Sequence, residues 1–235
     1  FSSDSMQGIS DTLNQLMDDV NVKGIVITGT GKFFCAGADI EEFQRCIDEG
    51  RIGPLVDNLT SILHPLQVRM RTDPTVLIAA MNGAAAGGGL GLALACDARI
   101  AAPQAKLAAA FFKLGLSPDG GTTWLLPRLV GNQVTRRFFF NDEVWSGEEA
   151  QEKGAVDTVV AMDELIDTAV DWAANWGKWS QLSRSGTKQL LDASTSTFFQ
   201  TQLEFEQALI IAASQTKEFE EGVAAFLEKR DPEFD

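Results

Sequence analysis

Two segments of this chain are rich in small residues, and each directly follows a short apolar run. Residues 34–39 read Phe-Cys-Ala-Gly-Ala-Asp after the run 24–28, and residues 82–90 contain a glycine triplet after the run 76–80. Small side chains leave backbone N–H groups uncovered, and a helix that begins near Gly88 adds the positive end of its dipole. The two segments therefore predict an oxyanion hole, in which backbone N–H groups hold a carbonyl oxygen.

One carboxylate stands out as a candidate acid or base. Asp119 lies in the turn Ser117-Pro-Asp-Gly-Gly121, and a Pro/Gly turn fixes the direction of its side chains. A carboxylate held against a substrate can move protons as a general acid or base. The alternative is that Asp119 only caps a helix beginning at Gly120, a position for which Asp is favoured.

The single histidine, His64, is a further candidate base. An imidazole has an unperturbed pKa of about 6.5 and suits proton transfer near neutral pH. Pro65 follows it, and proline disfavours helical geometry at the preceding residue. A surface position is the alternative interpretation.

The elements that must position these residues are strands and helices in alternation. Unbroken apolar runs at 24–28 and 76–80 are typical of strands buried on both faces, and residues 98–102 and 106–110 indicate further strands. In open α/β folds, ligands gather where such strands end. Helical spacing of apolar residues predicts helices at 5–19, from about 39, through 55–70, at 134–140, from 146, and at 163–176, 179–193, 198–213 and 218–229.

Six segments occur in the order found in the crotonase (enoyl-CoA hydratase/isomerase) superfamily, which the chain resembles over nearly its whole length. They are residues 36–40, 87–89, 95–97, 114–121, 126–128 and 221–230. The resemblance implies an α/β fold, namely a crotonase-type spiral of β-β-α units followed by a C-terminal helical trimerisation region. It implies a core at 1–130 and a helical region at 131–235 packed on that core. We expect the strand hairpin with which relatives usually begin, and any targeting segment, to lie outside this chain.

The resemblance also implies site residues for an acyl-CoA thioester. The oxyanion-hole donors fall on the backbone N–H groups of Ala38 and Gly88. Lys229 matches a lysine that relatives bring to the nucleotide, often from a neighbouring subunit, although a lysine there also suits a helix C-terminus. The residues expected to contact substrate or CoA are Ala36, Asp39, Ile40, Phe111, Trp124, Phe226 and Lys229.

The sequence departs from the hydratases of this superfamily at two positions. Hydratases use two glutamates to handle water, and Gly91 and Phe111 stand at those places here. The departure argues against hydration, which remains only the broad family label. An acid at the place of Asp119 resembles the 3-enoyl-CoA isomerases, and the surrounding segments look closest to the 1,2-epoxyphenylacetyl-CoA isomerases of aromatic acid degradation. The prediction is an isomerase in which Asp119 shuttles a proton.

Two alternatives remain open. In the 4-chlorobenzoyl-CoA dehalogenases of the superfamily, an acid at the place of Asp119 is the nucleophile, and a histidine near the place of His64 is the base. Those enzymes have a tryptophan where Phe111 stands. A non-catalytic acyl-CoA-binding protein is the other alternative, since it would keep the oxyanion segments without needing a poised acid.

The amino-acid composition excludes several classes of binding partner. The chain has 33 acidic against 19 basic residues, a net charge of −14, which disfavours nucleic acid and anionic membranes. No apolar run approaches the roughly 20 residues that a membrane helix needs. Three scattered cysteines show no metal-ligand spacing and suggest a reducing cytoplasm. We expect no metal and no cofactor beyond the CoA of the substrate, and a homotrimer or hexamer.

Overall fold

The first of two sheets is entirely parallel. The computed structural model describes residues 1–234, and this sheet has the strand order β1-β3-β5-β8. Every residue of β3 is buried, which explains its unbroken apolar sequence, and the strands predicted at 24–28 and 76–80 are confirmed. The strands are β1 (Gly24–Thr28), β3 (Val76–Met81), β5 (Ala98–Ala101) and β8 (Thr158–Val159).

The second sheet carries the two segments rich in small residues. Its order is β2-β4-β6-β7, and only the last pair is antiparallel. Because β2 and β4 are parallel neighbours, the segments that follow them leave the same edge of the sheet. The strands are β2 (Phe33–Cys35), β4 (Ala84–Ala86), β6 (Lys106–Ala108) and β7 (Val144–Ser146).

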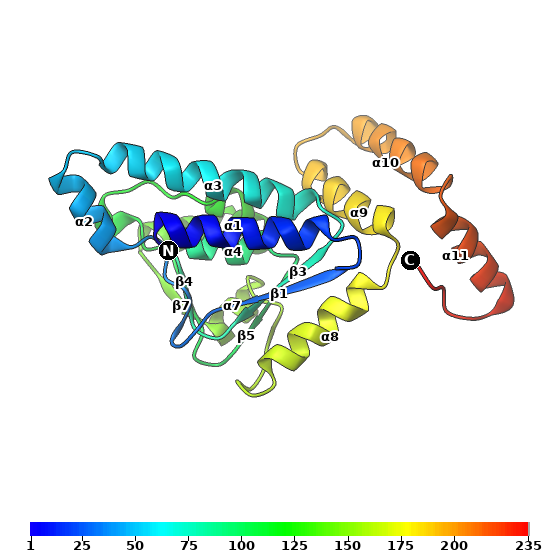
Figure 1. The fold of residues 1–235 in the computed structure, drawn as a ribbon, viewed down its shortest axis with the longest axis horizontal. Helices are drawn as coiled ribbons and strands as arrows, with labels where there is room; N and C mark the ends of the chain where they lie inside the picture. The colour runs from blue at the N-terminus through cyan, green and yellow to red at the C-terminus, as the bar shows by residue number, and fades with distance from the viewer. Residues whose placement is uncertain (235) are drawn as a thin grey trace.

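Helices cover the sheets from two sides. Helix α8 packs on the first sheet, where its Leu165, Ala169 and Ala173 join a buried cluster with alternate residues of β3 and β5. Helices α1 and α3 run side by side on the other side, close to α4 (Figure 1). The helices up to this layer are α1 (Ser3–Asp18), α2 (Ile40–Asp48), α3 (Ile52–Thr72), α4 (Gly88–Ala95), the 3₁₀ helix η1 (Phe112–Leu114), α5 (Thr122–Val130), α6 (Asn132–Phe140), α7 (Gly147–Lys153) and α8 (Leu165–Gly177).

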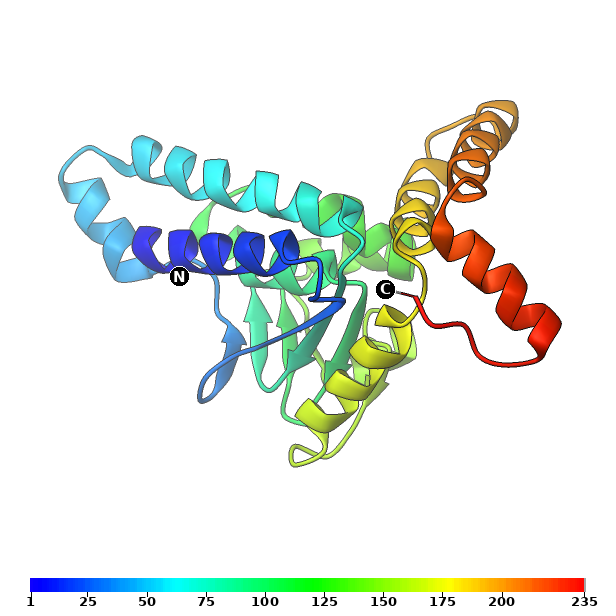
Figure 2. The same cartoon turned by 45° about the vertical axis from the view of Figure 1, so that its right-hand side comes forward.

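The last three helices form an arm that starts where α9 packs on α3 and then extends away from the sheets (Figure 2). They are α9 (Gln181–Ser194), α10 (Phe199–Ala213) and α11 (Lys217–Glu228). Helix α10 has no buried residue, and α11 buries only Ala225. Large apolar side chains such as Phe199, Ile210 and Phe226 are exposed on this arm. Trimerisation through it stays a prediction.

The helical region does not begin at residue 131, where the sequence placed it. Strands β7 and β8 lie beyond that point, and each completes one of the two sheets. They are only three and two residues long, too short for a periodic signal. The part of the chain up to about β8 therefore belongs to the sheet core, and the arm follows α8.

The expectation that Pro65 would disturb the helix at His64 is wrong. Helix α3 continues through Pro65. The neighbouring Leu63 and Leu66 are each only 2% exposed, so burial of this helix outweighs the local cost of a proline. His64 therefore projects from a regular helix. Among the described residues, no helix has both the length and the apolar character needed to cross a membrane.

Arg99 of β5 fastens the second half of the core to the first sheet. Its side chain donates to the carbonyl oxygens of Ala155 at 2.8 Å and Cys96 at 3.0 Å and pairs with Asp157 at 3.2 Å. Burial lowers the pKa of the Arg99 guanidinium because it disfavours the charge, while the nearby Asp157 opposes that shift. The guanidinium thus holds the turn between α7 and β8 on the sheet.

We expect Arg99→Met to lower the free energy of unfolding by about 3 kcal/mol, since two buried carbonyls and a carboxylate lose their donor. Chemical denaturation monitored by circular dichroism measures the change. Arg136→Met, at an exposed position on α6, is the matched control and should leave stability within about 0.5 kcal/mol of wild type. Equal effects of the two substitutions would contradict this structural role for Arg99.

Candidate active site

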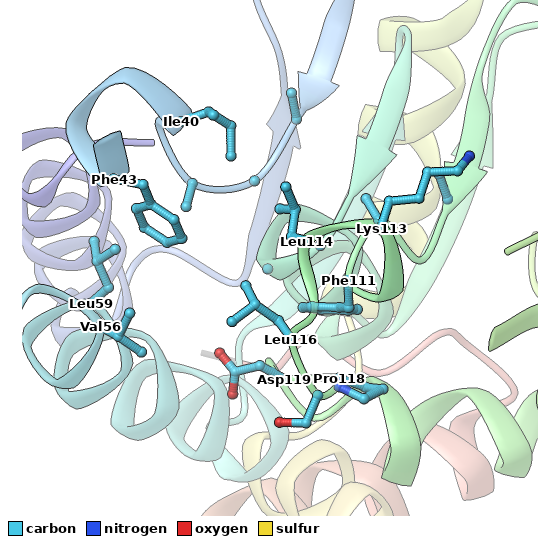
Figure 3. Close-up of a pocket in the computed structure, with 18 of the residues that line it drawn as sticks. Ile40, Phe43, Val56, Leu59, Phe111, Lys113, Leu114, Leu116, Pro118 and Asp119 are labelled. Carbon is cyan, nitrogen blue, oxygen red and sulfur yellow. The ribbon is translucent and has the colours of Figure 1, made fainter. Parts of the chain in front are cut away.

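A cavity of about 630 Å³ opens at the edge of the second sheet where its parallel strands end. One wall comes from α2 and α3, and the facing wall comes from the segment after β6 (Figure 3). The lining is mostly apolar, as is usual for small-molecule sites. Its polar side chains are Thr60, Lys113, Ser117, Asp119 and Asp142.

The two predicted oxyanion segments meet in this cavity. A Cβ atom at Gly37 would lie 2.9 Å from the carbonyl oxygen of Ala86, so the segments touch backbone to backbone. The N–H of Gly87 donates to Ala109 at 3.1 Å, and the N–H of Asp39 donates to Phe1 at 3.0 Å. These bonds brace the residues on either side of the predicted donors.

The N–H groups of Ala38 and Gly88 themselves have no acceptor within the part of the chain that the structure describes. Both residues line the cavity, and Gly88 is the first residue of α4. Two uncovered donors at one cavity, one of them at a helix N-terminus, can hold an oxygen that gains negative charge.

Asp119 also lines the cavity, and His64 holds its carboxylate. The Oδ1 atom of Asp119 lies 2.8 Å from Nε2 of His64. The side chains are partly exposed, 39% for Asp119 and 51% for His64. Helix α5 begins at Thr122 and has no side-chain capping bond, so the side chain of Asp119 is not its cap. The carboxylate is available for chemistry.

Helix α3 fixes the turn around Asp119 through a second contact. One helical turn beyond His64, Gln67 donates from Nε2 to the carbonyl oxygen of Gly120 at 2.9 Å. Gln67 is 7% exposed, so this bond is shielded from water. Residues three apart share a helix face, and that spacing is the signal by which Gln67 could have been found once His64 was placed on a helix.

Neither of the two positions that hold glutamates in hydratases can supply a carboxylate here. Gly91 has no room for a side chain, and Phe111 is apolar. A Cβ atom at Gly91 would lie 2.2 Å from the carbonyl oxygen of Gly120, so any side chain there collides with the turn that carries Asp119. Phe111 is 6% exposed and lines the cavity. Among the residues lining this cavity, Asp119 and Asp142 are the only carboxylates.

The remaining predicted site residues are divided between the cavity and the rest of the molecule. Ala36 and Ile40 line the cavity. Asp39 instead caps α2 by accepting from the N–H groups of its first turn. Trp124 lies on α5, outside the lining, with the Arg128 guanidinium 3.4 Å from its ring centroid.

Phe226 and Lys229 belong to the end of α11 and are not part of the lining. In Figure 1, α11 and the α2 side of the cavity lie at opposite ends of the molecule. Sequence reasoning missed Lys113 and Asp142, which line the cavity and pair with each other at 2.6 Å. Their separation along the chain gives no local signal.

The sequence over residues 1–235 matches the family model described as enoyl-CoA hydratase/isomerase. The chain belongs to this family. It is 35% identical over 237 residues to 1,2-epoxyphenylacetyl-CoA isomerase of Escherichia coli, covering 100% of this chain and 89% of that protein. It is equally 35% identical over 236 residues to a probable enoyl-CoA hydratase of Bacillus subtilis, covering 100% and 90%.

A solved structure supports the same assignment of fold. The crystal structure of an enoyl-CoA hydratase from Bacillus anthracis superposes with a TM-score of 0.90 at 31% identity, covering 100% of this chain and 89% of that one. The fold is therefore that of the crotonase superfamily, as the sequence predicted. Family membership establishes an enzyme of enoyl-CoA hydratase/isomerase type acting on acyl-CoA.

The contact between Gly91 and Gly120 predicts the effect of adding one methyl group. We expect Gly91→Ala to lower the free energy of unfolding by about 2 kcal/mol, because the added Cβ meets a backbone carbonyl that must move. Alanine otherwise favours a helix over glycine by about 1 kcal/mol. Gly8→Ala, in α1 with nothing within 4 Å of the new Cβ, is the control and should not destabilise. A Gly91→Ala variant as stable as wild type would contradict the contact.

Proposed function

We propose that the chain is an acyl-CoA isomerase that shifts a double bond, or rearranges a ring, by moving a proton through an oxyanion-stabilised thioester enolate. The observation that carries the proposal is the placement of one carboxylate, Asp119, in the same cavity as the uncovered N–H groups of Ala38 and Gly88. The acid and the donors act on different atoms of one substrate.

The proposed reaction needs only these groups. Asp119 takes a proton from the carbon next to the thioester carbonyl, and the electron pair of that C–H bond passes to the carbonyl oxygen. The N–H groups of Ala38 and Gly88 hold the resulting charge. The protonated Asp119 then returns the proton two carbons further along, and the double bond moves into conjugation. The substrate and the product have the same atoms, and no water enters.

His64 is proposed as the residue that orients the carboxylate. Its contact with Oδ1 leaves the second carboxylate oxygen unpaired with any described residue. Figure 3 shows the Asp119 carboxylate on the α3 side of its segment, near Leu116. A carboxylate with one oxygen held and one free can exchange a proton from a fixed position.

The composition of the cavity supports isomerisation over hydration. Hydration needs groups that orient and deprotonate water, and the positions of the hydratase glutamates are occupied by Gly91 and Phe111. The name of the Escherichia coli relative supports an isomerase acting on a CoA thioester, while several other relatives are named hydratases. The cytoplasmic location and the homotrimer or hexamer expected from the sequence stay predictions.

A second candidate, hydrolytic dehalogenation, is favoured by the contact between His64 and Asp119. In that reaction Asp119 attacks a ring carbon of a halobenzoyl-CoA and displaces halide, and His64 then activates the water that releases the product. The 2.8 Å contact between Asp119 and His64 supports this candidate, since a nucleophile and its base act at close range. One difference from those enzymes is that this chain has Phe111 at the position of their tryptophan.

Replacing the carboxylate tests the isomerase directly. We expect Asp119→Asn to lower kcat/KM for a 3-enoyl-CoA by about a thousandfold, because the amide keeps the size of the side chain but cannot accept the proton. The ultraviolet absorbance of the conjugated product measures turnover. Asp57→Asn, an exposed acid on α3, is the control. Unchanged turnover in Asp119→Asn would contradict Asp119 as the proton carrier, and no turnover by the wild type would favour the non-catalytic acyl-CoA-binding alternative.

Replacing the histidine separates the two candidate reactions. As an orienting residue, His64 should be replaceable by a hydrogen-bond donor, so we expect His64→Gln to lower isomerase kcat by less than about tenfold. The wild type should release no halide from 4-chlorobenzoyl-CoA, as measured with a halide electrode. Halide release by the wild type that disappears in His64→Gln would instead establish the hydrolytic reaction.

A further inference from the structure

The outer wall of the cavity has little support of its own. It is formed by the segment 109–119, which includes η1, and its side chains Leu114 and Leu116 are 51% and 41% exposed while lining the cavity. The hydrogen bonds of η1 and its flanks are local, joining Leu114 and Leu116 to Phe111. Phe111 is buried in the core. Among the described residues, hydrogen bonds from the rest of the chain reach the segment near its ends, at Ala109 and Asp119.

Two side-chain contacts join the middle of this wall to the end of α6. The ring of Phe112 meets Phe140 edge to face, with ring centroids 5.5 Å apart. Next to it, Nζ of Lys113 lies 2.6 Å from a carboxylate oxygen of Asp142. Both contacts reach the same short stretch, residues 140–142, which lies more than twenty residues beyond the end of the wall segment.

The backbone on the α6 side of these contacts is anchored next to buried residues, although the ring of Phe140 itself is 76% exposed. Phe138 and Phe139 are 0% and 5% exposed, and the N–H of Asp142 donates to Phe139 at 3.1 Å. Asp142 has a φ of 50°, a left-handed conformation that Asp adopts more readily than most residues. Its side chain is only 21% exposed, whereas that of Lys113 is 81% exposed, so the acid is the fixed partner.

We propose that Phe112 and Lys113, held by Phe140 and Asp142, form a clasp that keeps the outer wall in its ligand-binding position. The four side chains are positioning residues, and the assignment of an acyl-CoA as ligand rests on the proposed function. The clasp acts on affinity, because it sets the shape of the cavity without touching the proton shuttle at Asp119. Loss of the clasp raises KM and the dissociation constant and leaves kcat nearly unchanged.

The competing role for Lys113 is direct contact with the anionic ligand. It is the only cationic side chain among the residues that line the cavity, and CoA carries phosphates. The two roles make opposite predictions for Asp142. If Lys113 binds the ligand, removing its competitor Asp142 should tighten binding. If the pair is a clasp, removing either partner should weaken binding.

The experiment measures binding of octanoyl-CoA by calorimetry for the wild type, Lys113→Met, Asp142→Asn and the double variant. Asparagine also tolerates the left-handed conformation, so the backbone at 142 is preserved. We expect each single substitution to weaken binding about twofold, typical of an exposed ion pair, and the double variant to be no weaker than either single variant. Phe112→Leu should weaken binding about fivefold, as for loss of an aromatic pair. In every variant kcat for a 3-enoyl-CoA should stay within about twofold.

The control is Asp18→Asn, which removes the exposed partner of Arg69 outside the cavity and should not change binding. Tighter binding by Asp142→Asn, additive effects in the double variant, or wild-type affinity in all variants would overturn the clasp. Octanoyl-CoA cannot isomerise, so the binding test stands even if the wild type proves not to be an isomerase. No binding by the wild type would overturn the acyl-CoA assignment itself.

Discussion

The site depends on a contact between backbones in which side chains have no room. A Cβ atom at Gly91 would lie 2.2 Å from the carbonyl oxygen of Gly120, and one at Gly120 would be in ordinary contact, at 3.5 Å, with the Cα atoms of both Gly88 and Gly91. The first turn of α4, which carries the predicted oxyanion donor Gly88, therefore lies directly against the turn that carries Asp119. This contact fixes the distance between the proposed proton carrier and the proposed oxygen-binding group, and the bond from Gln67 to Gly120 holds it from the other side.

This constraint explains why the carboxylate of this chain comes from the turn and not from α4. A glutamate at position 91 would need space that the backbone of Gly120 occupies. The turn that carries Asp119 therefore occupies the space that a side chain at position 91 of α4 would need. In this chain the acid approaches from the turn, with His64 of α3 behind it. Packing between α4 and this turn thus determines which element can supply the carboxylate in this chain.

The sequence alone predicted those parts of the site that depend on a single short segment. Uncovered N–H groups need small residues in one short segment, so the segments around Ala38 and Gly88 could be found from the sequence. The pairing of His64 with Asp119, 55 residues apart, needed the path of α3, and the local effect of Pro65 pointed away from it. Strands β7 and β8 have too few residues for a pattern, and the ion pair of Lys113 with Asp142 depends on how two distant turns meet.

The contact between His64 and Asp119 also bears on which reaction the site can perform, isomerisation or hydrolysis. If His64 donates from Nε2 to an ionised Asp119, that nitrogen already carries a proton and cannot accept one from water. A proton from water would then have to go to the other ring nitrogen, Nδ1, and His64 is not itself part of the cavity lining. Asp119 lines the cavity, and its second oxygen has no partner among the described residues. A proton can therefore pass between substrate and Asp119 without any side chain changing its partner, which favours isomerisation over hydrolysis.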